Sequence, residues 1–134
     1  MVIPDFDVAG FLPAGVHPAT LAEIRARFGG PSEIRRAQME SIGWLINLAA
    51  RAGVRKIVLN GSFVTDIIEP NDVDCVLLIG PGASKDPTAE EELLQGLPFL
   101  DISLVGQNDF DYFIERFFAV DRMLRTKGMI EVVP

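Results

Sequence analysis

Two short apolar runs, KIVLN (residues 56–60) and VDCVLLI (residues 73–79), constrain the fold of this chain more than any other feature. Both are rich in β-branched residues, and both are shorter than a typical buried helix. Turn-forming residues bound them, because Gly61 closes the first run and Pro70 lies just before the second. The pattern predicts two buried strands joined by a loop.

Two helices are expected before these strands. Thr20 and Glu23 have the spacing of a capping box, in which each side chain satisfies a free backbone donor of the other, so a short helix should begin there. A longer helix is expected over residues 33–52, with Ser32 as its N-cap and Gly53 as its end.

Three further elements and a closing strand are expected after residue 80. Thr88 is the expected cap of a short helix that ends near Gln95, and Asn108 is the expected cap of the last helix. Between these two helices, alternation predicts a strand. Its apolar face is formed by Leu100, Ile102 and Leu104, and its more polar face by Asp101, Ser103 and Val105. The last helix should bury Phe110, Phe113, Ile114, Phe117 and Phe118. The segment GMIEVV is expected as an edge strand.

This order of elements predicts an α/β (α+β) fold with a small mixed β-sheet flanked by helices. A length of 134 residues fits a single domain, 1–134, in which residues 1–16, punctuated by proline and glycine, form an extended N-terminal arm.

Composition excludes several classes of protein. The net charge of −7 argues against a broad electrostatic grip on nucleic acid and leaves only a local basic patch open. No apolar stretch approaches the roughly 20 residues that span a bilayer. We therefore expect a protein without a membrane anchor. Cys75 is the one cysteine and cannot form an internal disulfide, so we expect a reducing compartment, the cytoplasm. Its place in an apolar run predicts a buried thiol.

Three aspartates are the candidate functional residues. Asp72 and Asp74 project from one face of a strand because side chains at i and i+2 point the same way, and Asp101 lies on the polar face of another strand. Carboxylates that converge repel one another unless cations are bound, and Mg²⁺ prefers such oxygen ligands. The plainer alternative is that Asp72 only completes a Pro-Asn-Asp turn.

The stretch LNGSFVTDIIEPNDVDCVLL resembles the signature of the DNA polymerase beta-like nucleotidyltransferase superfamily: Gly-Ser, a loop, then Asp-apolar-Asp-apolar, with a third carboxylate on a later strand. Gly61-Ser62, nine intervening residues and Asp72-Val73-Asp74-Cys75 match it, and Leu100-Asp101-Ile102 resembles the third-carboxylate strand. With DFDVAGFLPAGVHPATLAEIRARFG and KGMIEVV, nearly the whole chain is similar to a small bacterial family of minimal nucleotidyltransferase-like proteins whose function is unsettled.

This resemblance implies transfer of a nucleoside monophosphate from an NTP to an acceptor hydroxyl on a protein, a small molecule or RNA. It implies that Asp72, Asp74 and Asp101 bind two Mg²⁺ ions (or Mn²⁺), and that Gly61, Ser62 and Thr65 bind the nucleotide. Minimal members that are paired with helical toxin proteins imply that a partner protein supplies the acceptor.

One departure from the pattern motivates a second hypothesis. Active minimal members carry a basic residue soon after Gly-Ser, whereas this chain has Asp66 there and no lysine or arginine between Lys56 and Lys85. Charge compensation would then come from the metals or from Arg122, Arg125 or Lys127. The alternative function is a catalytically inactive, antitoxin-like binding subunit of the same fold. A homodimer through the terminal strand also stays open.

Three other residue types have plainer expectations. His17 is expected as a surface or packing residue, with a catalytic base as the alternative. Trp44 is expected in the core or at a partner contact, with a platform for base stacking as the alternative. Arg25, Arg27, Arg35 and Arg36 are expected on solvated helix faces, with a basic patch for RNA as the alternative.

Overall fold

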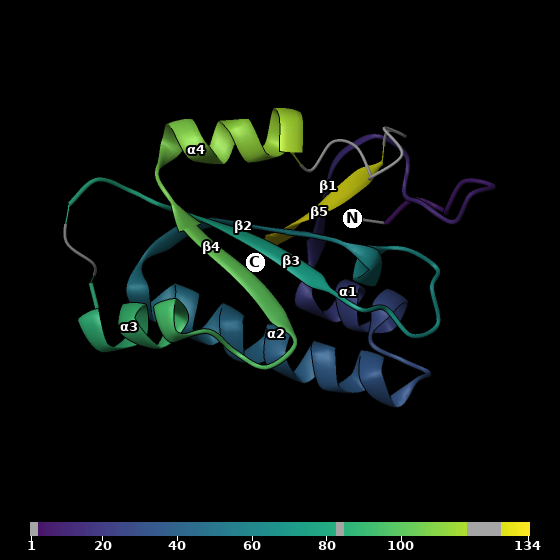
Figure 1. Ribbon diagram of the computed structural model, residues 1–134, viewed down its shortest axis with the longest axis horizontal. Helices are drawn as coiled ribbons and strands as arrows, with labels where there is room; N and C mark the ends of the chain where they lie inside the picture. Colours follow the sequence, from purple (N-terminus) through teal and green to yellow (C-terminus); the bar gives the residue numbers. More distant parts are fainter. Residues whose placement is uncertain (1–2, 83–84, 118–126) are drawn as a thin grey trace.

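The computed structural model describes residues 3–82, 85–117 and 127–134 of the chain (Figure 1). The strands are β1 (Gly15–Thr20), β2 (Val54–Asn60), β3 (Val73–Ile79), β4 (Leu100–Val105) and β5 (Gly128–Val133). The helices are α1 (Leu21–Phe28), α2 (Glu33–Ala52), α3 (Pro87–Gln95) and α4 (Gln107–Tyr112), and two shorter turns are the 3-10 turn η1 (Ser62–Val64) and the π-helical turn η2 (Phe113–Phe117).

The five strands form one mixed sheet in the order β1-β5-β2-β3-β4. The β1–β5 and β3–β4 pairs are parallel, and β2 is antiparallel to both β3 and β5. This confirms the small mixed sheet flanked by helices. The prediction that the last strand is an edge strand is wrong, because β5 lies between β1 and β2. The route to a homodimer that an open β5 edge suggested is therefore closed.

The two faces of the sheet are covered unequally. Helices α1, α2 and α3 lie on one face and α4 lies on the other (Figure 1). The larger core includes Leu59, Cys75 and Leu77 and packs under the first three helices. The smaller one joins Val58, Val76, Leu78 and Met129 to Phe110 of α4. Asp74 and Asp101 belong to the second face, because they alternate with the residues of the larger core.

Local signals near the first two helices are confirmed. Thr20 and Glu23 form the capping box, and the Ser32 side chain caps α2 over the predicted range. Gly53 ends α2 at φ 82°, in the left-handed region that favours glycine. The alternation expected for residues 100–105 is also confirmed, because β4 occupies that range and Leu100, Ile102 and Leu104 pack against the larger core.

Two predicted caps are wrong. Asp86 caps α3 by accepting from the backbone N–H groups of Thr88 and Ala89, so Thr88 lies inside the helix, behind a proline at the first turn. Gly106 is the N-cap of α4 in place of Asn108, and α4 ends at Tyr112, where η2 follows. Phe110 is buried as expected, and Phe113 and Ile114 pack beside it, while Phe118 lies outside the described residues.

The N-terminal arm is shorter than predicted, because β1 begins at Gly15. Its strand contains His17 and Pro18, which are poor strand formers, so parallel pairing with β5 decides its conformation. His17 has the structural role expected of it, since its Nε2 lies 2.6 Å from the Pro13 carbonyl oxygen. Among the described residues, no helix combines the length and the apolar character that crossing a membrane requires.

Candidate functional site

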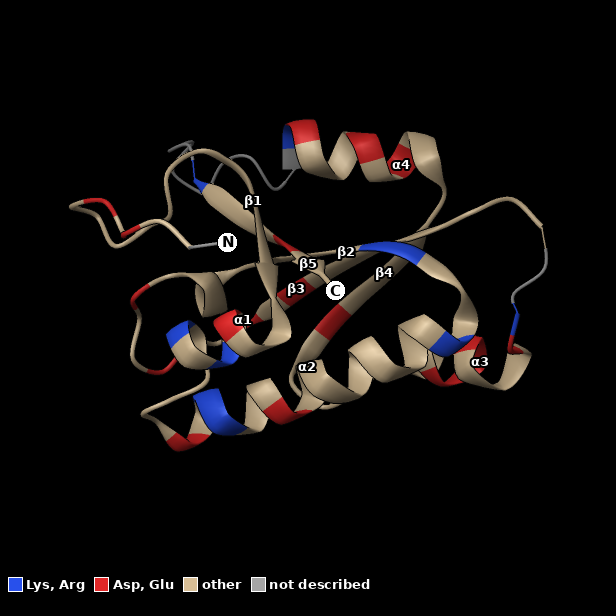
Figure 2. Ribbon diagram, turned by 180° about the vertical axis from the view of Figure 1, so that it is seen from behind, with Lys and Arg blue, Asp and Glu red and all other residues tan. Residues whose placement is uncertain are grey.

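The candidate site lies at one end of the sheet, where three neighbouring strands present polar side chains. Asp74 of β3 lies directly opposite Asp101 of the parallel strand β4 and opposite Asn60 of the antiparallel strand β2. Figure 2 shows acidic positions, in red, on both β3 and β4. Because residues that are paired across strands share a face, the three side chains project toward the same side of the sheet.

Ser62 ties the loop after β2 to the start of β3. Its hydroxyl donates to Asp72 Oδ1 at 2.7 Å and accepts from the backbone N–H groups of Asn71 and Asp72 at 3.0 and 3.3 Å. The Ser62 backbone N–H also points to Asp72 Oδ1, at 3.4 Å. Gly-Ser and the first aspartate, which are separated by nine residues in the sequence, are therefore held in direct contact.

Gly61 provides the space in which two carboxylates approach the backbone. It has φ 87°, which favours glycine, and a Cβ built there would lie 2.8 Å from Asp72 Oδ2 and 3.1 Å from Asp74 Oδ2. Both carboxylates therefore face the same small volume beside Gly61. A side chain at this position would fill it.

The carboxylates affect one another electrostatically. Burial raises the pKa of Asp74 to about 6, with further contributions from the charge of Asp72, a hydrogen bond with the Asp72 side chain and the charge of Asp101; Lys127 acts in the opposite direction. Cys75, the next residue, is 1% exposed, as expected for a buried thiol. Its pKa is raised mainly by burial, so it remains a neutral thiol.

The donor set of this site suits a hard divalent cation. Asp72 and Asp74 supply carboxylate oxygens beside Gly61, and Asp101 adds a third carboxylate from the adjacent strand. Burial and, after it, repulsion by the neighbouring carboxylates raise the pKa of Asp74, and a bound cation relieves that repulsion. As these side chains stand, no three His, Cys, Asp or Glu residues of the described ranges form a group closed enough to hold a metal ion.

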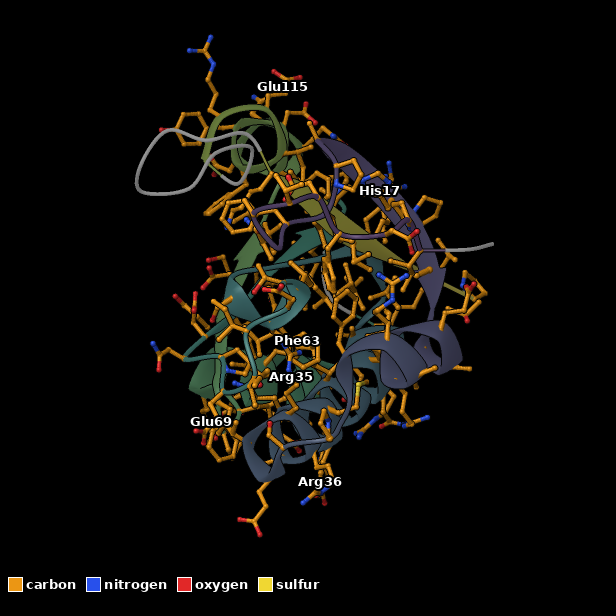
Figure 3. All side chains as sticks on the ribbon, turned by 90° about the vertical axis from the view of Figure 1, so that its right-hand side faces the viewer. His17, Arg35, Arg36, Phe63, Glu69 and Glu115 are labelled. Atoms are coloured by element: carbon orange, nitrogen blue, oxygen red, sulfur yellow. The ribbon has the colours of Figure 1, made fainter. Side chains whose placement is uncertain are left out.

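Arg35 of α2, expected on a solvated face, is instead 4% exposed and holds the loop after Gly61-Ser62. Its guanidinium donates to the carbonyl oxygens of Phe63 and Thr65, each at 2.8 Å, and to those of Phe28 and Ile67. It also lies 5.4 Å from the centre of the Phe63 ring (Figure 3). These hydrogen bonds of Arg35, called the Arg35 clamp below, fix η1 and the loop after it relative to α2.

Thr65 is part of this loop scaffold. Its hydroxyl donates to the Ser62 carbonyl oxygen at 2.6 Å, and the residue is 5% exposed. Asp66 lies against Gly10 of the N-terminal arm, whose carbonyl oxygen accepts from the Asp66 N–H at 3.1 Å. The sequence predicts that Thr65 binds the nucleotide. In the structure its hydroxyl holds the backbone of Ser62 through the Ser62 carbonyl oxygen.

Of the other three helix arginines, Arg25 and Arg36 are exposed as expected, and Arg27 differs. Arg27 donates to the carbonyl oxygens of Ile3 and Pro4 and lies 5.3 Å from the Phe6 ring centre, so it holds the arm. Arg36, in contrast, is exposed, and within the described part of the chain its side chain donates to the Pro31 carbonyl oxygen just before its own helix. A contiguous basic patch that includes Arg35 is therefore not formed.

A comparison with protein families matches residues 4–133, which is nearly all of the chain and includes every residue of the site. The chain belongs to DUF6932, a family of unknown function. No curated protein and no solved structure matches it significantly.

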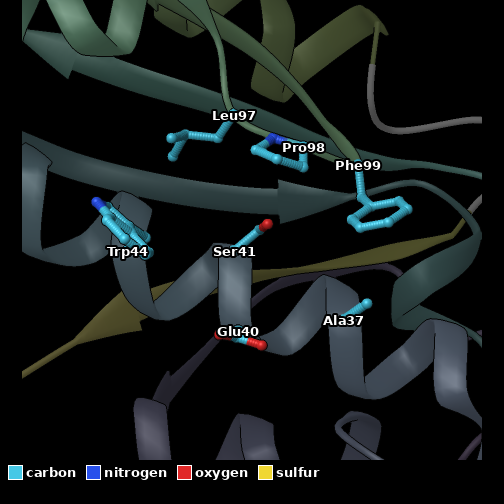
Figure 4. Close-up of a pocket in the computed structure, with 7 residues that line it drawn as sticks. All are labelled: Ala37, Glu40, Ser41, Trp44, Leu97, Pro98 and Phe99. Carbon is cyan, nitrogen blue, oxygen red and sulfur yellow. The ribbon is translucent and has the colours of Figure 1, made fainter.

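This DUF6932 chain has a second concave feature away from the Gly61–Asp72 contact. A groove of about 350 Å³ runs between α2 and the segment before β4 and is lined by Ala37, Glu40, Ser41, Trp44, Leu97, Pro98 and Phe99 (Figure 4). Trp44 is 60% exposed, so a core position is wrong for it. Phe99 has φ 67°, which is unusual for a bulky residue, and its ring is half exposed at the groove.

Proposed function

We propose that the protein is a metal-dependent nucleotidyltransferase with a nucleotidyltransferase-like fold, which transfers a nucleoside monophosphate from an NTP to an acceptor hydroxyl. The observation that carries this proposal is the convergence of Gly61, Ser62, Asp72 and Asp74 beside Asp101. Their spacing in the sequence and their contacts in space agree with the motif. The proposal places the reaction in the cytoplasm, in keeping with a free buried thiol.

In this proposal the aspartates have separate tasks. Asp72 and Asp74 would bind the ion that accompanies the triphosphate. Asp101, together with these two, would bind the second ion. Two such ions, Mg²⁺ or Mn²⁺, supply charge neutralisation at the attacking and leaving oxygens. The acceptor oxygen then bonds to the α-phosphorus, the bond to pyrophosphate breaks, and the proton of the acceptor hydroxyl goes to solvent.

In this proposal Gly61 leaves room for the phosphates, and Ser62 orients the metal-binding Asp72. The glycine leaves room for a phosphate to approach the backbone, as it leaves room for the carboxylates of Asp72 and Asp74. The Ser62 hydroxyl orients Asp72 through a 2.7 Å hydrogen bond. Thr65 acts indirectly, because its hydroxyl fixes the Ser62 carbonyl group.

The test is calorimetry of the purified chain with Mg²⁺ and each NTP, followed by transfer of labelled nucleotide into lysate. We expect the wild-type chain to bind at least one Mg²⁺–NTP complex, and we expect binding to be lost in the double variant Asp72→Asn/Asp74→Asn. Asp5→Asn is the matched control, because Asp5 is exposed on the arm. Absence of NTP binding in the wild-type chain would reject the proposal.

A second candidate function is a non-catalytic, antitoxin-like subunit that binds a partner protein. The groove beside Trp44 and Phe99 favours it, because two large apolar side chains are exposed on one concave surface. This candidate predicts a stable complex that survives replacement of all three aspartates by asparagine and is lost in Trp44→Ser. Loss of the partner in the triple aspartate variant would count against it.

A further inference from the structure

The acidic end of the sheet presents a charge problem that the local sequence does not solve. Asp72 and Asp74 both face the space beside Gly61, and Asp101 lies opposite Asp74 on β4. An NTP would add further negative charge here. No lysine or arginine occurs between Lys56 and Lys85 to offset it. A cation must therefore come from a distant part of the chain, and Arg122 and Arg125 lie outside the described residues.

Lys127 is placed at this end of the sheet by the strand register. β5 runs antiparallel to β2, with Glu131 opposite Val58 and Ile130 opposite Leu59. The beginning of β5 therefore lies toward the end of β2 that leads into Gly61, and Lys127 comes immediately before Gly128, the first residue of β5.

The face on which Lys127 lies follows from the same register. Val58 is paired with both Glu131 and Val76, so these side chains share a face. Asp74 lies two residues from Val76 within β3, so alternation puts it on that face. Lys127 directly precedes β5, four residues before Glu131, and the alternation of β5 carried back by one residue assigns it to the same face. Lys127 is half-buried, and its charge is close enough to lower the pKa of Asp74.

We propose that Lys127 is the basic residue of this site: it is the counter-ion of the aspartates without a divalent ion, and it binds the phosphate tail of the NTP in the loaded site. The inference rests on the proposed function. It goes beyond that function because it assigns the missing cation to the start of β5, 66 residues along the chain from Gly61. It also predicts an exchange of partners for this lysine.

The exchange has opposite consequences for the two ligands. Lys127 repels a divalent cation that binds alone, so removal of its charge should tighten that binding. A divalent ion and a unit charge about 8 Å apart in water interact strongly enough for an effect of about fivefold. The same lysine attracts the phosphates, so removal of its charge should weaken binding of the NTP, by about tenfold or more.

The experiment measures two affinities on four proteins by calorimetry: Mn²⁺ alone, and a non-hydrolysable ATP analogue in saturating Mg²⁺. The proteins are the wild-type chain, Lys127→Met, Lys127→Arg and the control Lys85→Met. Lys85 is exposed and contacts Gly53, which precedes the first residue of β2. It therefore lies at the end of β2 opposite to Gly61. A melting curve of each variant confirms folding.

We expect Lys127→Met to bind Mn²⁺ about fivefold more tightly and the analogue at least about tenfold more weakly. Lys127→Arg and Lys85→Met should resemble the wild-type chain in both. Equal affinities of Lys127→Met and wild type for the analogue would overturn the role of Lys127 and leave the proposed function standing. Binding of Mn²⁺ but of no analogue by the wild-type chain would overturn the proposed function and the phosphate contact together.

A change in the Mn²⁺ affinity distinguishes the counter-ion role from a merely structural one. If Lys127→Met weakens both ligands to a similar degree, the lysine stabilises the site without acting through its charge, and the inference is wrong. If it tightens Mn²⁺ and weakens the analogue, the opposite signs support an electrostatic exchange, because a general loss of structure cannot increase one of the two affinities.

Discussion

Asp74 and Asp101 are direct neighbours in the parallel β3–β4 pair, with their Cα atoms in register. Neighbouring strands lie roughly 4.8 Å apart, so the backbone itself keeps these two carboxylates close. Side-chain rotation changes the distance between their oxygens but cannot separate the residues. The charge pair is therefore a property of the fold, and it gives the site its affinity for cations in the proposed function.

The Asp74 carboxyl should make stability depend on pH. Its folded pKa, about 6, lies above the ordinary value of 3.8 for an aspartate, so its contribution to stability is present below about pH 4 and is lost as pH rises through 6. After allowance for solvent screening, the loss is on the order of 1 kcal/mol. Thermal unfolding of the wild-type chain and Asp74→Asn without divalent ions should show the variant gaining relative stability from pH 4 to 7.

Mg²⁺ at millimolar concentration should remove this difference at pH 7, because a bound cation favours the ionised carboxylate. The Asp5→Asn variant should follow the wild-type curve, since Asp5 is exposed on the arm. A constant gap between Asp74→Asn and wild type across this pH range would show that the Asp74 carboxyl is not perturbed.

Gly61→Ala should both destabilise the chain and weaken metal binding. An alanine at this position would be strained, because the backbone has φ 87°. Its Cβ would also meet Asp72 Oδ2 at 2.8 Å and the Asp72 carbonyl oxygen at 3.0 Å. We expect a loss of about 2 kcal/mol or more in the free energy of unfolding. Gly43→Ala in α2 is the control, because its Cβ meets nothing within 4 Å, and it should be neutral or stabilising. Equal stability of the two variants in denaturant titration would contradict the close approach.

Ser62→Ala should lower the affinity for Mn²⁺ because Asp72 loses the hydrogen bond that orients it. The variant also leaves the N–H groups of Asn71 and Asp72 without their acceptor, so we expect a destabilisation of about 1–2 kcal/mol. Ser103→Ala, two residues after Asp101 on β4, is the matched control. An unchanged Mn²⁺ affinity in Ser62→Ala, measured by calorimetry, would mean that Asp72 needs no support from Ser62.

Arg35→Met should be among the most destabilising single changes in the helices. It removes the donor for four backbone carbonyl groups in a buried setting, so the cost is about 3–5 kcal/mol. Arg36→Met is the control, because Arg36 is exposed and the bond seen for it in the described residues is to the Pro31 carbonyl oxygen. Chemical denaturation should separate the two variants clearly; similar midpoints for both would contradict the Arg35 clamp.

Sequence reasoning succeeded for the fold where local chemistry decides the structure. The capping box at Thr20, the Ser32 cap and the left-handed Gly53 are each determined within a few residues, and all were predicted. The strand β1 and the central place of β5 were missed because only their mutual pairing explains them. Asp86 was missed as a cap because Thr88, two residues later, can also cap a helix. In the structure Asp86 is the N-cap, and the proline that follows it is the first helical residue.

For the candidate site, the sequence predicted the residues that a motif connects and missed those that the fold brings in. Gly61, Ser62 and Asp72 are in contact as their spacing predicts. Arg35 gave no such signal, because its partners are carbonyl groups up to 32 residues away, and backbone acceptors leave no trace in composition. The resemblance implies that Thr65 binds the nucleotide, which stays a prediction; the contact that the structure adds is the hydrogen bond from its hydroxyl to the Ser62 carbonyl oxygen.

The measurement that tests the central claim most directly is the anomalous diffraction of a crystal soaked with Mn²⁺ and a non-hydrolysable NTP. The account predicts a peak about 2.1 Å from carboxylate oxygens of both Asp72 and Asp74, with the phosphates next to Gly61 and Ser62 and Lys127 turned toward them. Clear density for the analogue elsewhere, or no Mn²⁺ peak at these aspartates under saturating conditions, would contradict it.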